Sequence, residues 1–65
     1  MTEFQPYTLE PDEQPIGDER AYIALFGGTL HEVIGVAPDG HLDTAYGNSA
    51  QDAINRAIQA GLKPY

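Results

Sequence analysis

Cysteine is absent from this 65-residue sequence, and serine occurs once, at Ser49. Without cysteine the chain has no disulfide, no thiolate zinc site and no thiol nucleophile. We expect Ser49 to be occupied as a helix cap, which leaves no serine for nucleophilic catalysis. A chain of this length also buries a small core, with little room for a substrate pocket. The sequence therefore predicts a non-enzymatic domain without a cofactor.

Basic residues are scarce: three lysines and arginines face ten aspartates and glutamates, which gives a net charge of −7. Six of the ten acidic residues fall within residues 1–20, where Arg20 is the single basic residue. Binding to nucleic acid or to anionic membranes depends on Lys and Arg, so this composition disfavours both. A protein partner with a basic surface is favoured instead, through electrostatic complementarity. The alternative is that the acidity simply keeps a small domain soluble.

No apolar run is long enough to span a bilayer. The first residues are acidic and polar, unlike the basic and apolar start of a signal peptide. We therefore expect a cytoplasmic protein, of bacterial or phage origin.

The clearest element is a helix over residues 48–61, because both of its ends are marked. Ser49 is a typical N-cap, and Asp52 three residues later completes a capping box. Gly61 suits the left-handed conformation that ends a helix, and Pro64 follows it. An apolar stripe at helical spacing is made by Ala53, Ile54, Ala57 and Ile58. Such a stripe needs a second layer to pack against.

Three segments with strand character precede this helix, at residues 21–26, 29–37 and 41–46. Gly27-Gly28 and Pro38-Asp39-Gly40 are the predicted turns between them. These elements predict a two-layer α+β fold, in which a three-stranded antiparallel meander is packed by one C-terminal helix. Tyr7-Thr8-Leu9 alternates between prolines and could add a short N-terminal edge strand. We divide the chain into an acidic, proline-interrupted arm (residues 1–20) and a β-β-β-α domain (residues 21–65).

Apolar residues fall on both faces of the predicted sheet, whereas a single helix covers one face. The second face therefore needs a cover of its own. The arm, a second copy of the chain and a different partner are the alternatives, and a homodimer through edges or outer faces is one expectation.

The predicted partner-binding residues combine carboxylates of the arm with tyrosines. Carboxylates spaced along an extended segment can imitate nucleic-acid phosphates and occupy the basic groove of a nucleic-acid-binding protein. Tyrosine is enriched at interfaces, although it is also common in strands. The candidates are Glu10, Asp12, Glu13, Asp18 and Glu19 for the charge, with Tyr7, Tyr22 and Tyr46 as anchors.

Two histidines raise the alternative of a metal site. His31-Glu32 and His41-x-Asp43 lie on neighbouring predicted strands, where a suitable register would bring nitrogen and oxygen ligands together. Alternation, however, places His31 and Glu32 on opposite faces, and no H-E-x-x-H spacing occurs. Surface histidines beside carboxylates are therefore the favoured interpretation, and no metal ligand is predicted.

The run TAYGNSAQDAINRAIQAG (residues 44–61) is similar to the strand–turn–helix end of HicB-type antitoxin domains, where a strand leads through glycine into a capped, alanine-rich helix. In size and charge the chain also resembles small acidic phage inhibitors of host nucleases and defence complexes. Both resemblances imply a protein that binds and neutralises another protein. The predicted function is therefore inhibition of a basic, nucleic-acid-processing partner. The alternatives are a small dimeric structural protein that uses the outer sheet face, and a metal- or ligand-binding domain.

Overall fold

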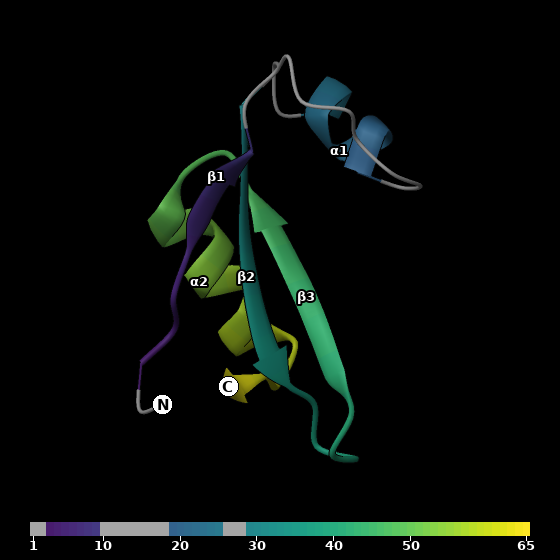
Figure 1. The fold of residues 1–65 in the computed structure, drawn as a ribbon, viewed down its shortest axis with the longest axis vertical. Helices are drawn as coiled ribbons and strands as arrows, with labels where there is room; N and C mark the ends of the chain where they lie inside the picture. Colours follow the sequence, from purple (N-terminus) through teal and green to yellow (C-terminus); the bar gives the residue numbers. More distant parts are fainter. Residues whose placement is uncertain (1–2, 10–18, 26–28) are drawn as a thin grey trace.

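The computed structural model of the chain describes residues 3–9, 19–25 and 29–65. In chain order its elements are β1 (Tyr7–Leu9), α1 (Glu19–Leu25), β2 (Leu30–Val36), β3 (Leu42–Gly47), α2 (Ala50–Gln59) and β4 (Lys63–Pro64). The longer helix, α2, lies against one face of an antiparallel sheet centred on β2 (Figure 1). This is the predicted two-layer α+β fold with one main C-terminal helix.

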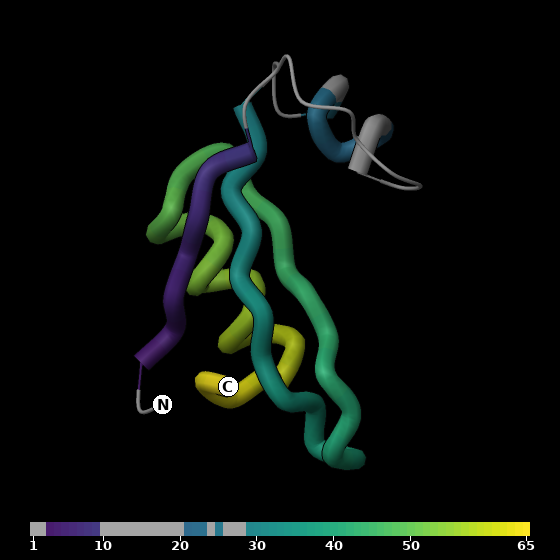
Figure 2. The backbone as a smooth tube through the Cα atoms, in the orientation of Figure 1, coloured from purple at the N-terminus to yellow at the C-terminus, as the bar shows by residue number. Residues whose placement is uncertain are grey.

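β2 is the central strand and is paired along both of its sides. On one side β3 pairs with it from His31 opposite Gly47 to Val36 opposite Leu42. The other side is shared, because β1 pairs with residues 30–32 and β4 with residues 35–36. Figure 2 shows the N-terminal and C-terminal segments along this same side of β2. The expected N-terminal edge strand is thus present as β1.

The strand predicted over residues 21–26 is wrong, because Glu19–Leu25 form helix α1. Five of the seven residues of α1 are glutamate, arginine, alanine or leucine, which favour a helix, and Ile23 is its one β-branched residue. In addition, the position beside β2 that this strand would need is occupied by β1 and β4. The predicted turn at Gly27-Gly28 lies outside the described residues.

The turn predicted at Pro38-Asp39-Gly40 closes the β2–β3 hairpin. The N–H of Gly40 donates to the C=O of Ala37 (2.9 Å), and the N–H of Ala37 donates to the C=O of His41 (2.7 Å). Gly40 has a φ of +92°, which is the left-handed position of a three-residue hairpin loop. Ala37 is thus bonded through its N–H to His41 and through its C=O to Gly40, which is a G1 bulge, and this sets the alternation of the whole β2–β3 ladder.

The two ends of α2 also follow the sequence. The Oγ of Ser49 accepts the N–H of Asp52 (3.0 Å), as an N-cap should. At the other end Gly61 has a φ of +82° and donates to the C=O of Ile58 (3.0 Å), while Leu62 donates to Ala57 (2.9 Å). This pair of bonds is a Schellman motif, which satisfies carbonyls that the helix leaves unpaired.

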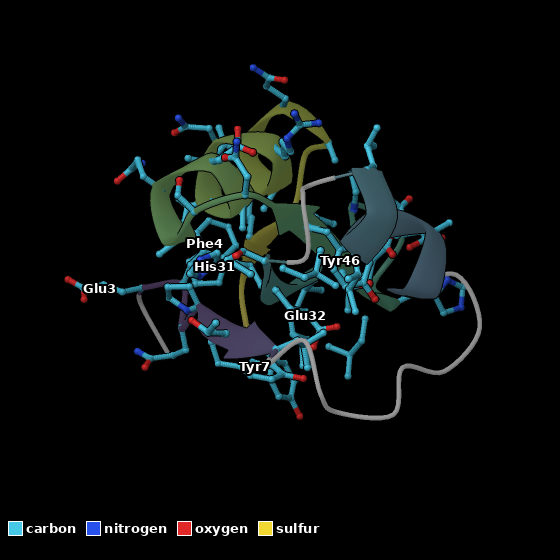
Figure 3. All side chains as sticks on the ribbon, turned by 90° about the horizontal axis from the view of Figure 1, so that it is seen from above. Glu3, Phe4, Tyr7, His31, Glu32 and Tyr46 are labelled. Carbon is cyan, nitrogen blue, oxygen red and sulfur yellow. The ribbon has the colours of Figure 1, made fainter. Side chains whose placement is uncertain are left out.

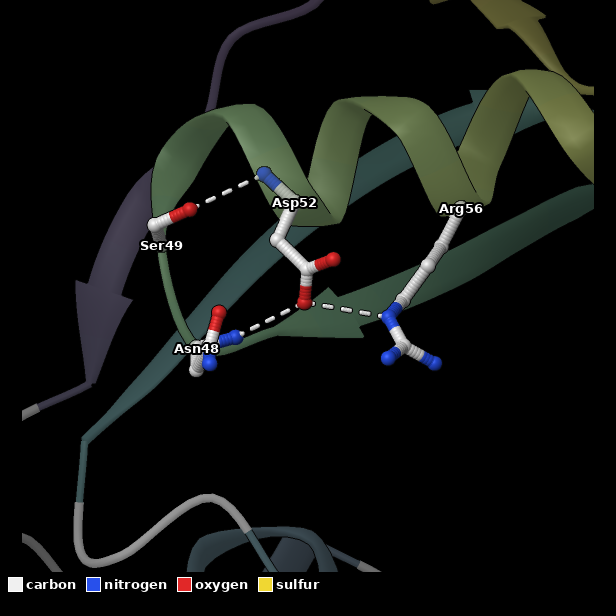
Figure 4. A network of polar contacts seen from close by, with 4 residues as sticks. All are labelled: Asn48, Ser49, Asp52 and Arg56. Atoms are coloured by element: carbon white, nitrogen blue, oxygen red, sulfur yellow. Dashed lines mark hydrogen bonds and ion pairs between the residues drawn. The ribbon is translucent and has the colours of Figure 1, made fainter.

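The side chain of Asp52 connects the start of α2 to its next turn (Figure 4). Its Oδ2 accepts the backbone N–H of Asn48 (3.1 Å) and the Nε of Arg56 (3.0 Å). The capping box thus reaches Asn48, one residue earlier than the N-cap itself. The N–H of Asn48 first, and the Arg56 side chain second, hold the pKa of Asp52 below its ordinary value.

We predict that Asp52→Asn makes stability less dependent on pH in the acidic range. A carboxyl whose pKa is lowered by folding adds stability that is fully present above its unfolded pKa, about 4, and is lost as the pH falls through its folded pKa. The wild-type chain should therefore lose more unfolding free energy than the variant between about pH 5 and pH 3. Urea denaturation at each pH measures the difference, and two parallel pH curves would contradict the prediction.

The core lies between α2 and the sheet face that it covers. Val33 and Ala45 from the sheet meet Ala53 and Ala57 from the helix, and Leu62 closes one end. The small helix side chains let α2 lie close to the strands. Partly buried Phe4, Ala37 and Ile54 pack around this cluster.

Candidate interaction surface

The face of the sheet opposite α2, here called the outer face, consists of the alternate strand residues. Val33 faces α2, so alternation directs Leu30, Glu32 and Ile34 of β2 to the outer face. Figure 3 shows Phe4 and His31 on the α2 side, and Tyr7 and Glu32 on the other. From β3 the register adds Leu42, Thr44 and Tyr46 to this face.

Two of the three predicted tyrosine anchors are in direct contact. The ring of Tyr22, from α1, stacks on the ring of Tyr46, from β3, with centroids 4.6 Å apart and an interplanar angle of 28°. Ring stacking at this separation is favourable for aromatic pairs. It joins α1 to the sheet at the outer face. The expectation of a strand at residues 21–26 did not predict the contact between Tyr22 and Tyr46.

The third anchor, Tyr7, lies in the same row across the sheet. Glu32 pairs with Tyr7 on one side and with Tyr46 on the other, so the three side chains share one face. The Tyr7 side of the row is open, since this residue is 49% exposed, whereas Glu32 is only 5% exposed. The structure thus brings all three tyrosines to the outer face, around one buried carboxyl group.

Away from this row, the outer face carries exposed aliphatic side chains. Ile34 is 41% exposed and Leu42 is 56% exposed. Glu3, Gln5, Ile34 and Tyr65 line an open hollow of about 260 Å³ on the β1 and β4 side of the sheet. Apolar side chains are therefore available on both sides of β2.

Of the five predicted acidic residues, the structure describes only one, and of that one only the backbone. Glu10, Asp12, Glu13 and Asp18 lie outside the described residues, and of Glu19 the structure describes the backbone, as the first residue of α1. The flanking elements are described. Leu9, at the end of β1, pairs with Leu30 on the outer face, and α1 contacts the same face through Tyr22. The described elements that flank the acidic residues in the sequence, β1 and α1, thus both contact this face.

The two histidines are not brought together. His31 pairs with Gly47 at one end of the β2–β3 ladder, whereas His41 lies beyond the other end, next to the turn. The Nδ1 of His31 lies 3.1 Å from Thr8 Oγ1, and the Nδ1 of His41 lies 2.8 Å from Asp39 Oδ2. The backbone N–H of His41 and then its ring hold the pKa of Asp39 below its ordinary value. Among the described residues no group of three or more histidine and carboxylate side chains is placed to hold a metal.

Two residues have structural roles that the sequence did not predict. Glu32 is buried between two tyrosines, a property of the register that local patterns do not contain. The carboxylate of Asp43 accepts the backbone N–H of Thr44, with 2.8 Å between Oδ1 and N. An aspartate in the middle of a predicted strand is itself unusual, and this was the available signal.

No helix among the described residues is long and apolar enough to cross a membrane. Comparison with known proteins adds no assignment: no family model, no curated protein and no solved structure matches the chain.

Proposed function

We propose that this protein is a non-enzymatic interaction module that binds a cytoplasmic protein with a basic, nucleic-acid-processing surface and blocks that surface. The observation that carries the proposal is the position of the tyrosines. Tyr7, Tyr22 and Tyr46 gather on one face, and β1 and α1, which flank the acidic residues in the sequence, both contact that face.

Charge and apolar area would have separate roles in such a complex. The carboxylates of Glu10, Asp12, Glu13, Asp18 and Glu19 steer a basic partner and compete with its nucleic acid. The tyrosines and the exposed Ile34 and Leu42 supply the area that holds it. A net charge of −7 favours such a partner over a nucleic acid.

The test is the salt dependence of partner binding after charge changes. The native-host lysate is first passed over the immobilised chain at low salt, and the retained protein is then purified for titration. Lysine at all five acidic positions should weaken its binding by well over tenfold, that is by more than about 1.4 kcal/mol, and should reverse the salt dependence. Unchanged affinity would overturn the proposal.

A smaller pair of variants separates a local effect from net charge. Glu13→Gln with Asp18→Asn and, as control, Asn55→Lys with Gln59→Lys change the net charge by the same amount. The control residues are exposed on α2, on the opposite side of the sheet from the tyrosines. We expect the first pair to weaken binding and the second to leave it nearly unchanged. Equal losses would mean that the partner senses net charge rather than this face.

The exposed Ile34 and Leu42 favour one other function, a small structural protein that dimerises through its outer face. Sedimentation at increasing protein concentration distinguishes the two. A monomer at high concentration argues against the structural role, and a dimer that buries the tyrosines argues against partner capture.

A further inference from the structure

The outward side of β3 is an edge of the sheet that the described strands form. β3 pairs with β2 along one side, and no described strand pairs with its other side. The hydrogen bond from the N–H of Ala37 to the C=O of His41 fixes the ladder, and alternation then turns the N–H and C=O of Asp43 and Ala45 toward β2. The same alternation turns those of Leu42 and Thr44 outward, away from the sheet.

The outward N–H of Thr44 already has an acceptor, and this acceptor is an anion. The N–H of Thr44 donates to the carboxylate of the preceding residue, Asp43 (2.8 Å). It does not donate to β2, because the alternation turns it outward. Both residues are exposed, so the carboxylate can be displaced by another acceptor. The Asp43 side chain therefore occupies the place that the carbonyl of an added strand would take.

The side chains next to this edge specify what could be added. Leu42 and Thr44 point to the outer face, where Leu42 is 56% exposed and Thr44 lies opposite the exposed Ile34. An added strand would place every second side chain beside them, and apolar groups fit there. The intervening side chains would lie beside Asp43, where a cation would be favoured because the displaced carboxylate is negatively charged and could form a charge-assisted hydrogen bond with it.

We propose that the outward edge of β3 receives an extended, basic segment of the partner protein, which adds to the sheet as a further strand. Its carbonyl replaces Asp43 as the acceptor of the Thr44 N–H, and its lysine or arginine pairs with the released carboxylate. This mode of recognition takes affinity from the backbone and specificity from alternate side chains. The inference rests on the proposed function, because it takes the basic partner from there and names the form in which it binds.

A second copy of the chain fits this edge poorly. Two β3 strands paired about Thr44 would place each Asp43 opposite Ala45, with the two carboxylates one diagonal step apart, about 7–8 Å. Each copy also carries a net charge of −7. Repulsion between the two Asp43 carboxylates and between the two net charges disfavours this dimer. A lysine beside Asp43 would instead be attracted to its carboxylate.

The test uses a synthetic peptide of alternating valine and lysine, with a control peptide in which glutamate replaces every lysine. Amide hydrogen exchange, followed by NMR on the wild-type chain, reports the edge directly. A saturating amount of the lysine peptide should slow exchange at Leu42 and Thr44 by about tenfold or more, and the glutamate peptide should not. If the lysine peptide slows neither amide, the inference is overturned, whether or not any variant folds.

Two variants at Thr44 provide the matched comparison. Thr44→Pro removes the outward N–H without removing a bond to β2, and proline is tolerated at such edge positions. Thr44→Val keeps the N–H and loses only the hydroxyl group. We expect the proline variant to bind the lysine peptide at least about tenfold more weakly, and the valine variant to bind like wild type. Equal binding by the two variants would overturn the inference.

The outcomes separate this inference from the proposed function. Protection of Leu42 and Thr44 that rises with protein concentration, in the absence of peptide, would identify a second copy as the occupant and overturn the inference. Loss of partner binding in the charge variants together with normal binding in Thr44→Pro would leave the proposed function intact and exclude the β3 edge. Addition of the lysine peptide at β3, together with unchanged partner binding by the five-lysine variant, would support the β3 edge as a binding site and overturn the proposed function.

Discussion

Replacement of Leu30 by alanine should lower the free energy of unfolding by about 3 kcal/mol, within the usual range for a buried leucine. Leu30 is fully buried, at 0% exposure, although it lies on the outer face of the sheet. There it pairs with the buried Leu9, apart from the cluster that α2 covers. A domain of this size has about 3–10 kcal/mol of stability in all, so the variant should be close to unfolding.

The control is Leu42→Ala, the same substitution on the same face of the neighbouring strand. Leu42 is more than half exposed, so less apolar area returns to water and the loss should stay below about 1 kcal/mol. Urea denaturation followed by circular dichroism measures both values. Similar losses at the two positions would contradict the burial of Leu30, and with it the apolar contact between Leu30 and Leu9 on the outer face.

Replacement of Gly47 by alanine should also destabilise the chain strongly, by about 3 kcal/mol, the upper end for a substitution that overfills a packed site. A β-carbon at Gly47 would lie 2.5 Å from the backbone N of Ala53 and 2.6 Å from Oδ2 of Asp52. These atoms belong to the first turn of α2, so relief would require the helix to move off β3. Glycine is therefore required here by the close approach of the helix backbone.

Gly40→Ala is the matched comparison for Gly47→Ala. Gly40 has a positive φ, but a β-carbon there would meet no atom within 4 Å. Its cost is backbone strain alone, about 1–2 kcal/mol. The two variants thus separate strain from steric overlap. If Gly47→Ala cost less than the strain expected at Gly40, the close approach of α2 to β3 would not be the reason for the glycine at position 47.

Local signals were sufficient for the β2–β3 turn and for α2, although they did not predict β4. Ser49 and Gly61 mark the ends of α2 through hydrogen bonds between residues close in sequence. Pro38 and Gly40 do the same for the hairpin. In each case the residues that decide the structure lie within a few positions of one another, so the sequence pattern contains the needed information.

The misassigned segment shows where local signals end. Residues 21–26 combine aromatic, alanine and isoleucine residues in a pattern that is compatible with either a strand or a helix. The structure is decided elsewhere, because β1 and β4 fill the side of β2 that a third hairpin strand would need. Those pairings connect residues more than twenty positions apart, and no periodicity within one segment reports them.

The residues of the candidate surface could be chosen from the sequence, but their contacts could not, because these contacts depend on residues that are distant in sequence. The tyrosines could be chosen by residue type, but the contact between Tyr22 and Tyr46 depends on α1 being a helix. The hydrogen bond from Thr44 to Asp43 depends on which strand lies at the edge. The roles given to the five arm carboxylates remain predictions, with the charge variants as their test.

The shared side of β2 has a consequence for aggregation. Gly35 is enclosed by Phe4 from the N-terminal segment and by Leu62 and Lys63 from the C-terminal segment. Local opening of β4 would uncover the backbone of β2 beside Gly35 and Val36. An unfilled edge of this kind can pair with a strand of another molecule. The two residues of β4 thus protect the central strand from pairing between molecules.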